Sequence, residues 1–191
     1  VGDDRGDLFA LCWEALERSE VIICTGGLGP TFDDFTKEVF AEVAGVELRE
    51  DAPARAELLA WYSARGRTPT DNNFKQVQFP LGAEPLRNPL GTAPGVWWED
   101  PPGYPGRVVI MLPGVPREMQ RLWEDHVEPR LRSRSGTVVH RLRMVVAGVP
   151  ESTLDEKTHE LRARHGELEW TILASLTQVE LQARHSDPAA L

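Results

Sequence analysis

The chain has 191 residues, enough for one α/β domain and a smaller appended unit. Hydrophobic residues make up 41% and charged residues 27%, a globular composition that excludes a disordered or fibrous protein, and no apolar run is long enough to cross a bilayer. The net charge of −9 argues against binding nucleic acid over a broad surface. It also implies that an anionic ligand must be held by a metal ion or by directed backbone N–H groups.

The two cysteines cannot build a disulfide framework, and no Cys/His spacing is typical of a zinc site. Cys12 lies on an apolar helix face and Cys24 ends an apolar strand, so neither is placed like a nucleophile. No secretory signal is visible at the start of the chain, and the cytoplasm is the expected compartment.

Strands alternate with helices over the first two thirds of the chain, which favours an α/β/α sandwich with a mainly parallel sheet. Apolar spacing predicts helices at about residues 7–17, 32–44, 52–64 and 116–127. Short apolar or β-branched runs predict strands at residues 21–24, 96–99 and 108–112, and a weaker one at 77–79 or 84–86. Proline clusters at 80–94, 101–105 and 113–116 predict loops.

The last third of the chain has a different pattern. Ser133, Ser135 and Gly136 interrupt the apolar pattern, so we expect a boundary at residues 132–136 that separates a domain over 1–135 from one over 136–191. The second domain is predicted as a β-α-β-β unit of α+β character, with a strand at 138–146, a helix at 152–164 and strands at 170–174 and 179–183.

The first loop that could carry chemistry has the sequence TGGLGPTFDDFT and runs from Thr25 to Thr36. A strand enters this glycine turn and a helix leaves it, so the backbone can approach a ligand closely and helix N–H groups can face a phosphate. It is neither a Walker loop nor GxGxxG. The adjacent carboxylates Asp33 and Asp34 suggest a metal or general-base site. Alternatively, Thr31 and Asp34 form a capping box with a purely structural role.

Two further loops have a related composition. The segment NPLGTAPG, residues 88–95, offers the Asn88 amide, the Gly91 backbone and the Thr92 hydroxyl, or is simply a proline-stiffened turn. The segment LPGVPREM, residues 112–119, again passes from a strand through Gly114 to a helix start, where Glu118 is favoured electrostatically without any catalytic role. Loops after the carboxyl ends of strands line the ligand crevice of α/β sheets, so we expect the first and third loops to converge.

These motifs, together with Asn73-x-Lys75-Gln76 between them, resemble those of the competence/damage-inducible protein family CinA. The matching segments span about residues 25–119 and resemble the family's N-terminal domain, which is similar to molybdopterin-binding domains of the MoaB/Mog type. The tail from about Thr137 resembles the KH-like connecting domain of the same family. Residues 136–191 contain no GxxG, the loop that clamps a nucleotide backbone in KH modules, so no nucleic-acid partner is expected.

The resemblance implies an ADP-ribose pyrophosphatase that depends on a divalent metal such as Mg²⁺. Asp33 and Asp34 would hold the metal or orient the attacking water, and ADP-ribose or a related nucleotide would be the ligand. The ligand-binding residues would be Thr25, Gly26, Gly27, Gly29, Thr31, Thr36, Lys75, Asn88, Gly91, Thr92, Gly114 and Glu118. The alternative is a non-catalytic module that binds a molybdopterin or a nucleotide and acts as a scaffold or in oligomerisation.

Two departures from the family pattern accompany the resemblance. The chain opens at Val1-Gly2-Asp3-Asp4, which resembles a later segment of the family's domain, so its first strand, glycine/acidic loop and helix are expected to be missing here. Nothing matches the C-terminal deamidase domain that relatives often carry. We expect no membrane partner, and a homodimer formed through the tail, because symmetric dimers are the commonest oligomers.

Overall fold

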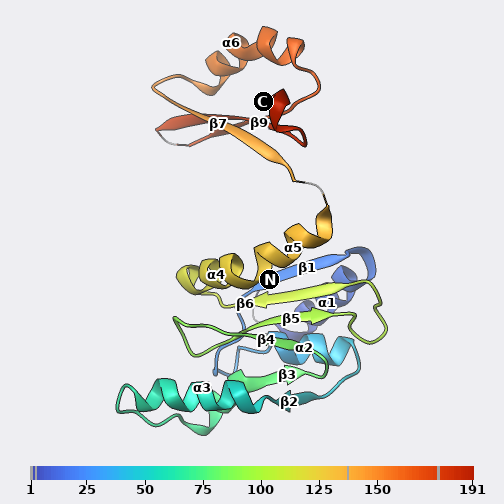
Figure 1. Ribbon diagram of the computed structural model, residues 1–191, viewed down its shortest axis with the longest axis vertical. Helices are drawn as coiled ribbons and strands as arrows, with labels where there is room; N and C mark the ends of the chain where they lie inside the picture. The colour runs from blue at the N-terminus through green and yellow to red at the C-terminus, as the bar shows by residue number, and fades with distance from the viewer. Residues whose placement is uncertain (1, 3, 137, 176) are drawn as a thin grey trace. The chain divides into compact units, whose positions relative to one another are not determined.

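The computed structural model of the chain describes residues 2, 4–136, 138–175 and 177–191 (Figure 1). Val1, Asp3 and Thr137, on which part of the family resemblance depends, lie outside the described residues, as does Leu176. The chain divides into two compact units, Val1–Arg130 and Leu131–Leu191. Each unit is described by itself.

The first unit alternates helices and short strands, as the apolar spacing predicts. Its helices are α1 (Arg5–Arg18), α2 (Thr36–Val43), α3 (Ala52–Ser63), the 3₁₀ segment η1 (Asp71–Val77) and α4 (Pro116–Leu122). α4 continues through the π-helical segment η2 (Trp123–Val127) into α5 (Glu128–Ser135), of which residues 128–130 belong to this unit. Its strands are β1 (Val21–Thr25), β2 (Leu48–Glu50), β3 (Gln78–Pro80), β4 (Glu84–Leu86), β5 (Gly95–Glu99) and β6 (Val108–Leu112). Of these, β2 and η1 were not expected from the sequence.

The main sheet has the strand order β1-β6-β5-β4, and these strands lie side by side in Figure 1. β1 pairs with β6 in parallel, with Ile23 opposite Ile110, whereas β5 is antiparallel to both β6 and β4. The sheet is therefore mixed, where the sequence pattern predicted mainly parallel pairing. The reason is the short connection at residues 100–107, because a tight turn can join only antiparallel neighbours. The α/β class is confirmed.

The core lies on both faces of this sheet. On one face, Val109 and Met111 of β6 belong to an apolar cluster with residues of α1 and α2 such as Leu16 and Phe40. Ile110 and Leu112 alternate with them and are also completely buried, so a second layer covers the opposite face. α4 contacts β6 and buries Leu122 completely. The sheet is thus enclosed between helices, and its strand ends deliver the loops described below.

Helix α2 begins later than the sequence predicts. The prediction placed its start at Phe32 and therefore put Asp33 and Asp34 in the first helical turn. The helix begins at Thr36, with Phe35 as its N-cap, so both acidic residues lie in the turn that precedes it. The predicted end is confirmed, since Gly45 follows the C-cap with a φ of 66°, a conformation that favours glycine.

The second unit has the predicted β-α-β-β order. β7 (His140–Ala147), α6 (Glu151–Arg164), β8 (Glu169–Ala174) and β9 (Gln178–His185) form a three-stranded antiparallel sheet, ordered β7-β9-β8, with one helix. A short 3₁₀ turn, η3 (Pro188–Ala190), follows. Leu154 of α6 packs against Val179 and Leu181 of the central strand β9. Leu142 and Met144 of the edge strand β7 stay about half exposed.

No helix in the described part of the chain is long and apolar enough to cross a membrane.

The paired residues Ile23 and Ile110 provide a matched test of where the first unit is stabilised. Ile110 is completely buried and Ile23 is 46% exposed. Ile110→Ala should lower the free energy of unfolding by about 2–5 kcal/mol, because it leaves a cavity in the centre of the sheet. Ile23→Ala should cost about 1 kcal/mol or less. Urea denaturation of both variants checks this, and equal losses would place the core elsewhere.

Candidate functional site

The parallel pairing of β1 and β6 brings two of the predicted loops together. Both strands end at the same edge of the sheet, and the Gly26 N–H donates a hydrogen bond to the Leu112 carbonyl at 2.9 Å. Gly114 lies so close to Gly26 that a side-chain Cβ placed on Gly114 would be 3.4 Å from the Gly26 Cα. The predicted convergence of the first and third loops is therefore what the fold produces.

A cavity of about 460 Å³ opens between these loops and the 88–95 loop. Eight of the residues predicted from the sequence line it: Gly26, Gly27, Gly29, Asp34, Gly91, Thr92, Gly114 and Glu118. The other lining residues are Leu28, Trp61, Gln76, Leu90, Ala93, Pro113 and Val115. The predicted residues Thr25, Thr31, Asp33, Thr36, Lys75 and Asn88 are not among the lining residues.

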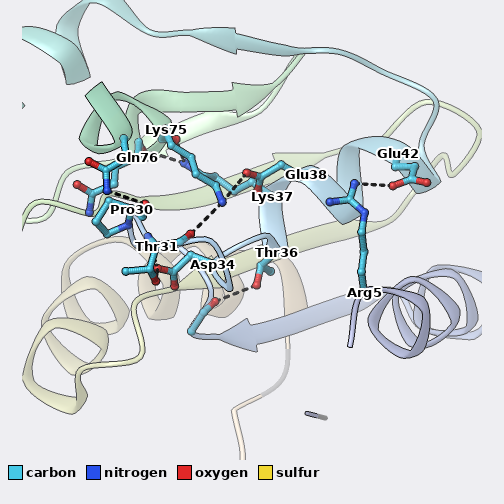
Figure 2. A network of polar contacts seen from close by, with 12 residues as sticks. Arg5, Pro30, Thr31, Asp34, Thr36, Lys37, Glu38, Glu42, Lys75 and Gln76 are labelled. Atoms are coloured by element: carbon cyan, nitrogen blue, oxygen red, sulfur yellow. Dashed lines mark hydrogen bonds and ion pairs between the residues drawn. The ribbon is translucent and has the colours of Figure 1, made fainter. Parts of the chain in front are cut away.

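The glycine loop is held to the start of α2 through its carbonyls. Thr36 donates from its backbone N–H to the Gly27 carbonyl at 3.2 Å and from its hydroxyl to the Gly26 carbonyl at 3.1 Å, a bond drawn in Figure 2. Gly27 has a φ of 69°, and a Cβ there would lie 2.0 Å from the Thr36 hydroxyl oxygen, so only glycine fits. The sequence predicted that the helix N–H groups face a ligand, but the loop itself occupies the Thr36 donor.

Asp34 has the bonds of the predicted capping arrangement and also lines the cavity. Its Oδ2 accepts hydrogen bonds from the Thr31 N–H at 2.9 Å and from the Thr31 hydroxyl at 2.5 Å (Figure 2). The Thr31 side chain also lowers the pKa of the Asp33 carboxyl. Asp33 is exposed and lies outside the cavity wall. The structural and the functional interpretation of Asp34 are therefore compatible.

Asn88 organises the second loop. Its amide nitrogen donates to the Ala93 carbonyl at 2.9 Å and to Glu118 Oε2 at 2.7 Å, and its amide oxygen accepts from the N–H groups of Leu90 and Gly91. These four bonds use the ordinary hydrogen-bonding capacity of the amide. Asn88 thus fixes the loop and orients Glu118 rather than lining the main cavity. A Cβ on Gly91 would lie 2.3 Å from Glu118 Oε2, so the loop and the carboxylate are closely packed.

The Lys75-Gln76 pair is arranged differently from the prediction, which chose Lys75 as the ligand contact. The Lys75 ammonium pairs with Glu38 at 3.1 Å and donates to the Thr31 carbonyl (Figure 2). Gln76 instead lines the cavity, where it is 2% exposed and donates from Nε2 to the Thr92 hydroxyl at 3.1 Å. Gln76 belongs to the sequence motif, but no role was predicted for it. The signal that could have found it is its place directly before the weak strand predicted at 77–79.

A second, smaller cavity of about 220 Å³ is also lined by Trp61, Gly91 and Thr92, so it adjoins the first. Its wall comes mainly from α3 and from residues 87–94. Trp61 was not identified from the sequence. Its indole N–H is buried without a hydrogen-bond partner among the described residues, and Arg65 lies over its ring at 3.6 Å from the centroid.

The main cavity offers oxygen ligands. Two carboxylates face it, Asp34 from the turn before α2 and Glu118 from the first turn of α4, and no Lys or Arg is among the described residues that line it. No group of three or more His, Cys, Asp or Glu in the described part of the chain could hold a metal ion alone. Mg²⁺ is commonly bound by one or two carboxylates together with substrate phosphates, and this donor set fits that mode. The structure does not bring Asp33, the other predicted ligand, into the cavity wall.

Neither cysteine is placed like a nucleophile, as the sequence predicts. Burial raises the pKa of the Cys12 thiol to about 12, and burial also raises the pKa of the Cys24 thiol. Neither residue lines the main cavity.

The geometry of the three loops agrees with the comparison to known protein families. The family model described as "Probable molybdopterin binding domain" matches residues 1–133. The chain therefore belongs to this family of molybdopterin-binding domains.

Similar sequences place the chain among the CinA-like proteins. It is 44% identical over 164 residues to a CinA-like protein of a Synechococcus species and 41% identical over 172 residues to one of Myxococcus xanthus. These matches cover 84% and 86% of this chain but only 38% and 39% of the relatives. A protein of Pyrobaculum aerophilum is 43% identical over 81% of this chain and 57% of its own length. The chain thus spans about half the length of these relatives or less.

One solved structure is similar over about two thirds of this chain. The protein CinA from Thermoplasma acidophilum, described as having an unknown function, superposes with a TM-score of 0.57 at 37% sequence identity. The similarity covers 66% of this chain and 72% of that one.

The glycine loop offers a matched pair of substitutions. Gly27→Ala should destabilise the protein strongly, because its Cβ would overlap the Thr36 hydroxyl and its φ is unfavourable. Gly26→Ala has a similarly unfavourable φ of 92°, but a Cβ there meets no atom within 4 Å, so its cost should be about 1–2 kcal/mol from the backbone alone. Thermal unfolding of both variants checks the order. A smaller loss for Gly27→Ala would contradict the described packing.

The buried residue Lys37 of α2 should make the free energy of unfolding depend on pH. Burial lowers the pKa of its ammonium from 10.5 to about 7, an effect that Lys75 reinforces and that Glu38 and Asp34 oppose. The unfolded chain therefore binds one more proton than the folded chain between about pH 7 and 10.5, so the stability of the native protein rises with pH across this window. Relative to Lys37→Met, the wild type should gain about 1.4 kcal/mol per pH unit. Denaturation at pH 6 to 9.5 checks this, and parallel curves would contradict it.

Proposed function

We propose that this chain hydrolyses the diphosphate bond of a nucleotide, with ADP-ribose as the expected substrate and a divalent metal ion as the cofactor. The observation that carries the proposal is the main cavity, which combines glycine-rich backbone, two carboxylates and no Lys or Arg among its described lining residues. A diphosphate in such a cavity would be repelled by Asp34 and Glu118 unless a cation lay between them. The resemblance to the CinA family supports the choice of substrate.

The residues of the chain have separate roles in this proposal. Asp34 and Glu118 would hold the metal ion, which when bound neutralises diphosphate charge and lowers the pKa of an attacking water. Thr31 fixes one oxygen of Asp34 through two hydrogen bonds and leaves the other oxygen available. Asn88 orients Glu118. Gly26 offers open space above its backbone, where a phosphate could approach closely.

The second candidate function is a binding module that holds a pterin or a nucleotide without turnover. The observation that favours it is the family itself, since the matching model describes a molybdopterin-binding domain. Such a module would use the same glycine loops and would not need a metal ion. The homodimer expected from the sequence stays a prediction and is independent of this choice.

The proposed function is tested by the metal dependence of ADP-ribose hydrolysis. Turnover of ADP-ribose is measured with Mg²⁺ present and again with a chelator present. Hydrolysis to AMP and ribose phosphate that disappears on chelation supports the proposal. Tight binding without any turnover, unchanged by chelation, supports the binding module instead. The measurement should include a longer version of the protein, because the relatives extend well beyond the matched region.

Asp34 and Asp33 form a matched pair for the catalytic assignment. Asp34→Asn keeps an oxygen that can accept from Thr31, so its melting temperature should stay close to that of the wild type, while turnover falls by about a hundredfold or more. Asp33→Asn, which changes an exposed carboxyl outside the cavity wall, should retain most of the turnover. Steady-state kinetics at saturating Mg²⁺ checks both. A larger loss of turnover in Asp33→Asn than in Asp34→Asn would instead favour Asp33 as the metal-binding or catalytic carboxylate, a role that the sequence also predicted for it.

A further inference from the structure

Lys37 is a buried charged group to which the proposed chemistry assigns no role. It projects from α2 and is 1% exposed. Its ammonium donates hydrogen bonds to the backbone carbonyls of Lys75 at 3.0 Å and Gln76 at 2.9 Å, and it lies 4.8 Å from the centre of the Phe79 ring. Figure 2 shows it between the turn of Asp34 and the segment of Lys75 and Gln76.

Stability alone does not explain a lysine at this position. A buried ammonium is costly to desolvate even when it is well bonded, and an apolar side chain of similar volume often gives an equal or higher stability. The partners of Lys37 are also backbone carbonyls rather than carboxylates, and the adjacent Glu38 pairs with Lys75 instead. The role of Lys37 therefore lies in the backbone segment that its two hydrogen bonds hold in place.

The hydrogen bonds of Lys37 connect it to residues that line the main cavity. The carbonyl that Lys37 binds most closely belongs to Gln76, whose side chain donates to the Thr92 hydroxyl at 3.1 Å. Both Gln76 and Thr92 line the main cavity. Lys37 directly follows Thr36, the residue that bonds to the carbonyls of Gly26 and Gly27. The first two residues of α2 therefore connect the glycine loop to η1, and Gln76 extends this connection to the 88–95 loop.

We propose that Lys37 is a positioning residue that fixes the backbone of Gln76, so that the Gln76 side chain holds Thr92 and the 88–95 loop in place beside the glycine loop. The residue acts through Gln76 and touches no ligand. Its effect on turnover rests on the proposed function, whereas its effect on the order of the 88–95 loop does not.

The charges around Lys37 agree with this role. Glu38 and Asp34 favour its ammonium form, and burial and Lys75 disfavour it, so the balance places its pKa at about 7. The ammonium is a stronger hydrogen-bond donor than the neutral amine. The hold on Gln76 should therefore weaken as the pH rises through neutrality.

The experiment compares Lys37→Met, Gln76→Ala and Lys157→Met with the wild type. Lys157, an exposed residue of α6, is the matched control. Hydrogen–deuterium exchange is measured at the amides of residues 88–95 in the free protein. Lys37→Met and Gln76→Ala should each raise these exchange rates about tenfold or more, by local unfolding. Lys157→Met should leave them unchanged, and the melting temperature of Lys37→Met should not fall by more than a few degrees.

Combining the substitutions tests the relay. If Lys37 acts through Gln76, the double variant should exchange no faster at 88–95 than either single variant, because both remove the same link. Additive effects would overturn the proposal. Wild-type exchange in Gln76→Ala would overturn it even if Lys37→Met failed to fold. Wild-type exchange in a folded Lys37→Met would overturn it as well.

A turnover measurement separates this proposal from the proposed function. If the wild type hydrolyses ADP-ribose, Lys37→Met should lower kcat and Lys37→Arg should restore part of it, and the wild-type activity should fall above pH 7 with a slope that Lys37→Met lacks. If the wild type shows no hydrolysis while Lys37→Met loosens the 88–95 loop, the proposed function fails and the positioning role stands.

Discussion

The parallel pairing of β1 with β6 is the constraint on which the rest of the site depends. Parallel strands end at the same edge of a sheet, so this single pairing delivers both the glycine loop and the loop at Gly114 to one place. The two backbones then approach so closely that the Gly26 N–H bonds directly to the Leu112 carbonyl. The acidic and polar side chains are added to a space that the strand pairing has already created.

The second feature of the site is that two carboxylates line one cavity of an acidic protein. Asp34 and Glu118 come from segments that are far apart in the sequence, and each is fixed by neutral donors, Thr31 and Asn88 respectively. The described residues of the cavity wall include no lysine or arginine that could pair with either carboxylate. Their charge is therefore available to a ligand, and the cavity is suited to a cation before it is suited to an anion.

The sequence predicted the α/β fold, the three loops and eight of the residues that line the cavity, because glycine turns, apolar strands and acidic pairs are local signals. It could not separate Asp33 from Asp34, or Lys75 from Gln76. Neighbouring residues in a turn point in different directions. Which of Asp33 and Asp34 faces the cavity depends on where α2 begins, and capping signals place a helix start only within a few residues. Lys37 and Trp61 were missed for a related reason, since their burial comes from segments distant in sequence.

The shared wall of the two cavities has a consequence for how the ligand can be varied. The two carboxylates belong to the turn before α2 and to the start of α4, whereas the smaller cavity takes most of its wall from α3 and residues 87–94. Residues of α3 such as Glu57 and Ala60 can be exchanged without altering the strand pairing or either carboxylate. Engineering of ligand selectivity can therefore begin on one face of a single helix, and a library limited to that face would leave the carboxylates and glycines of the main cavity intact.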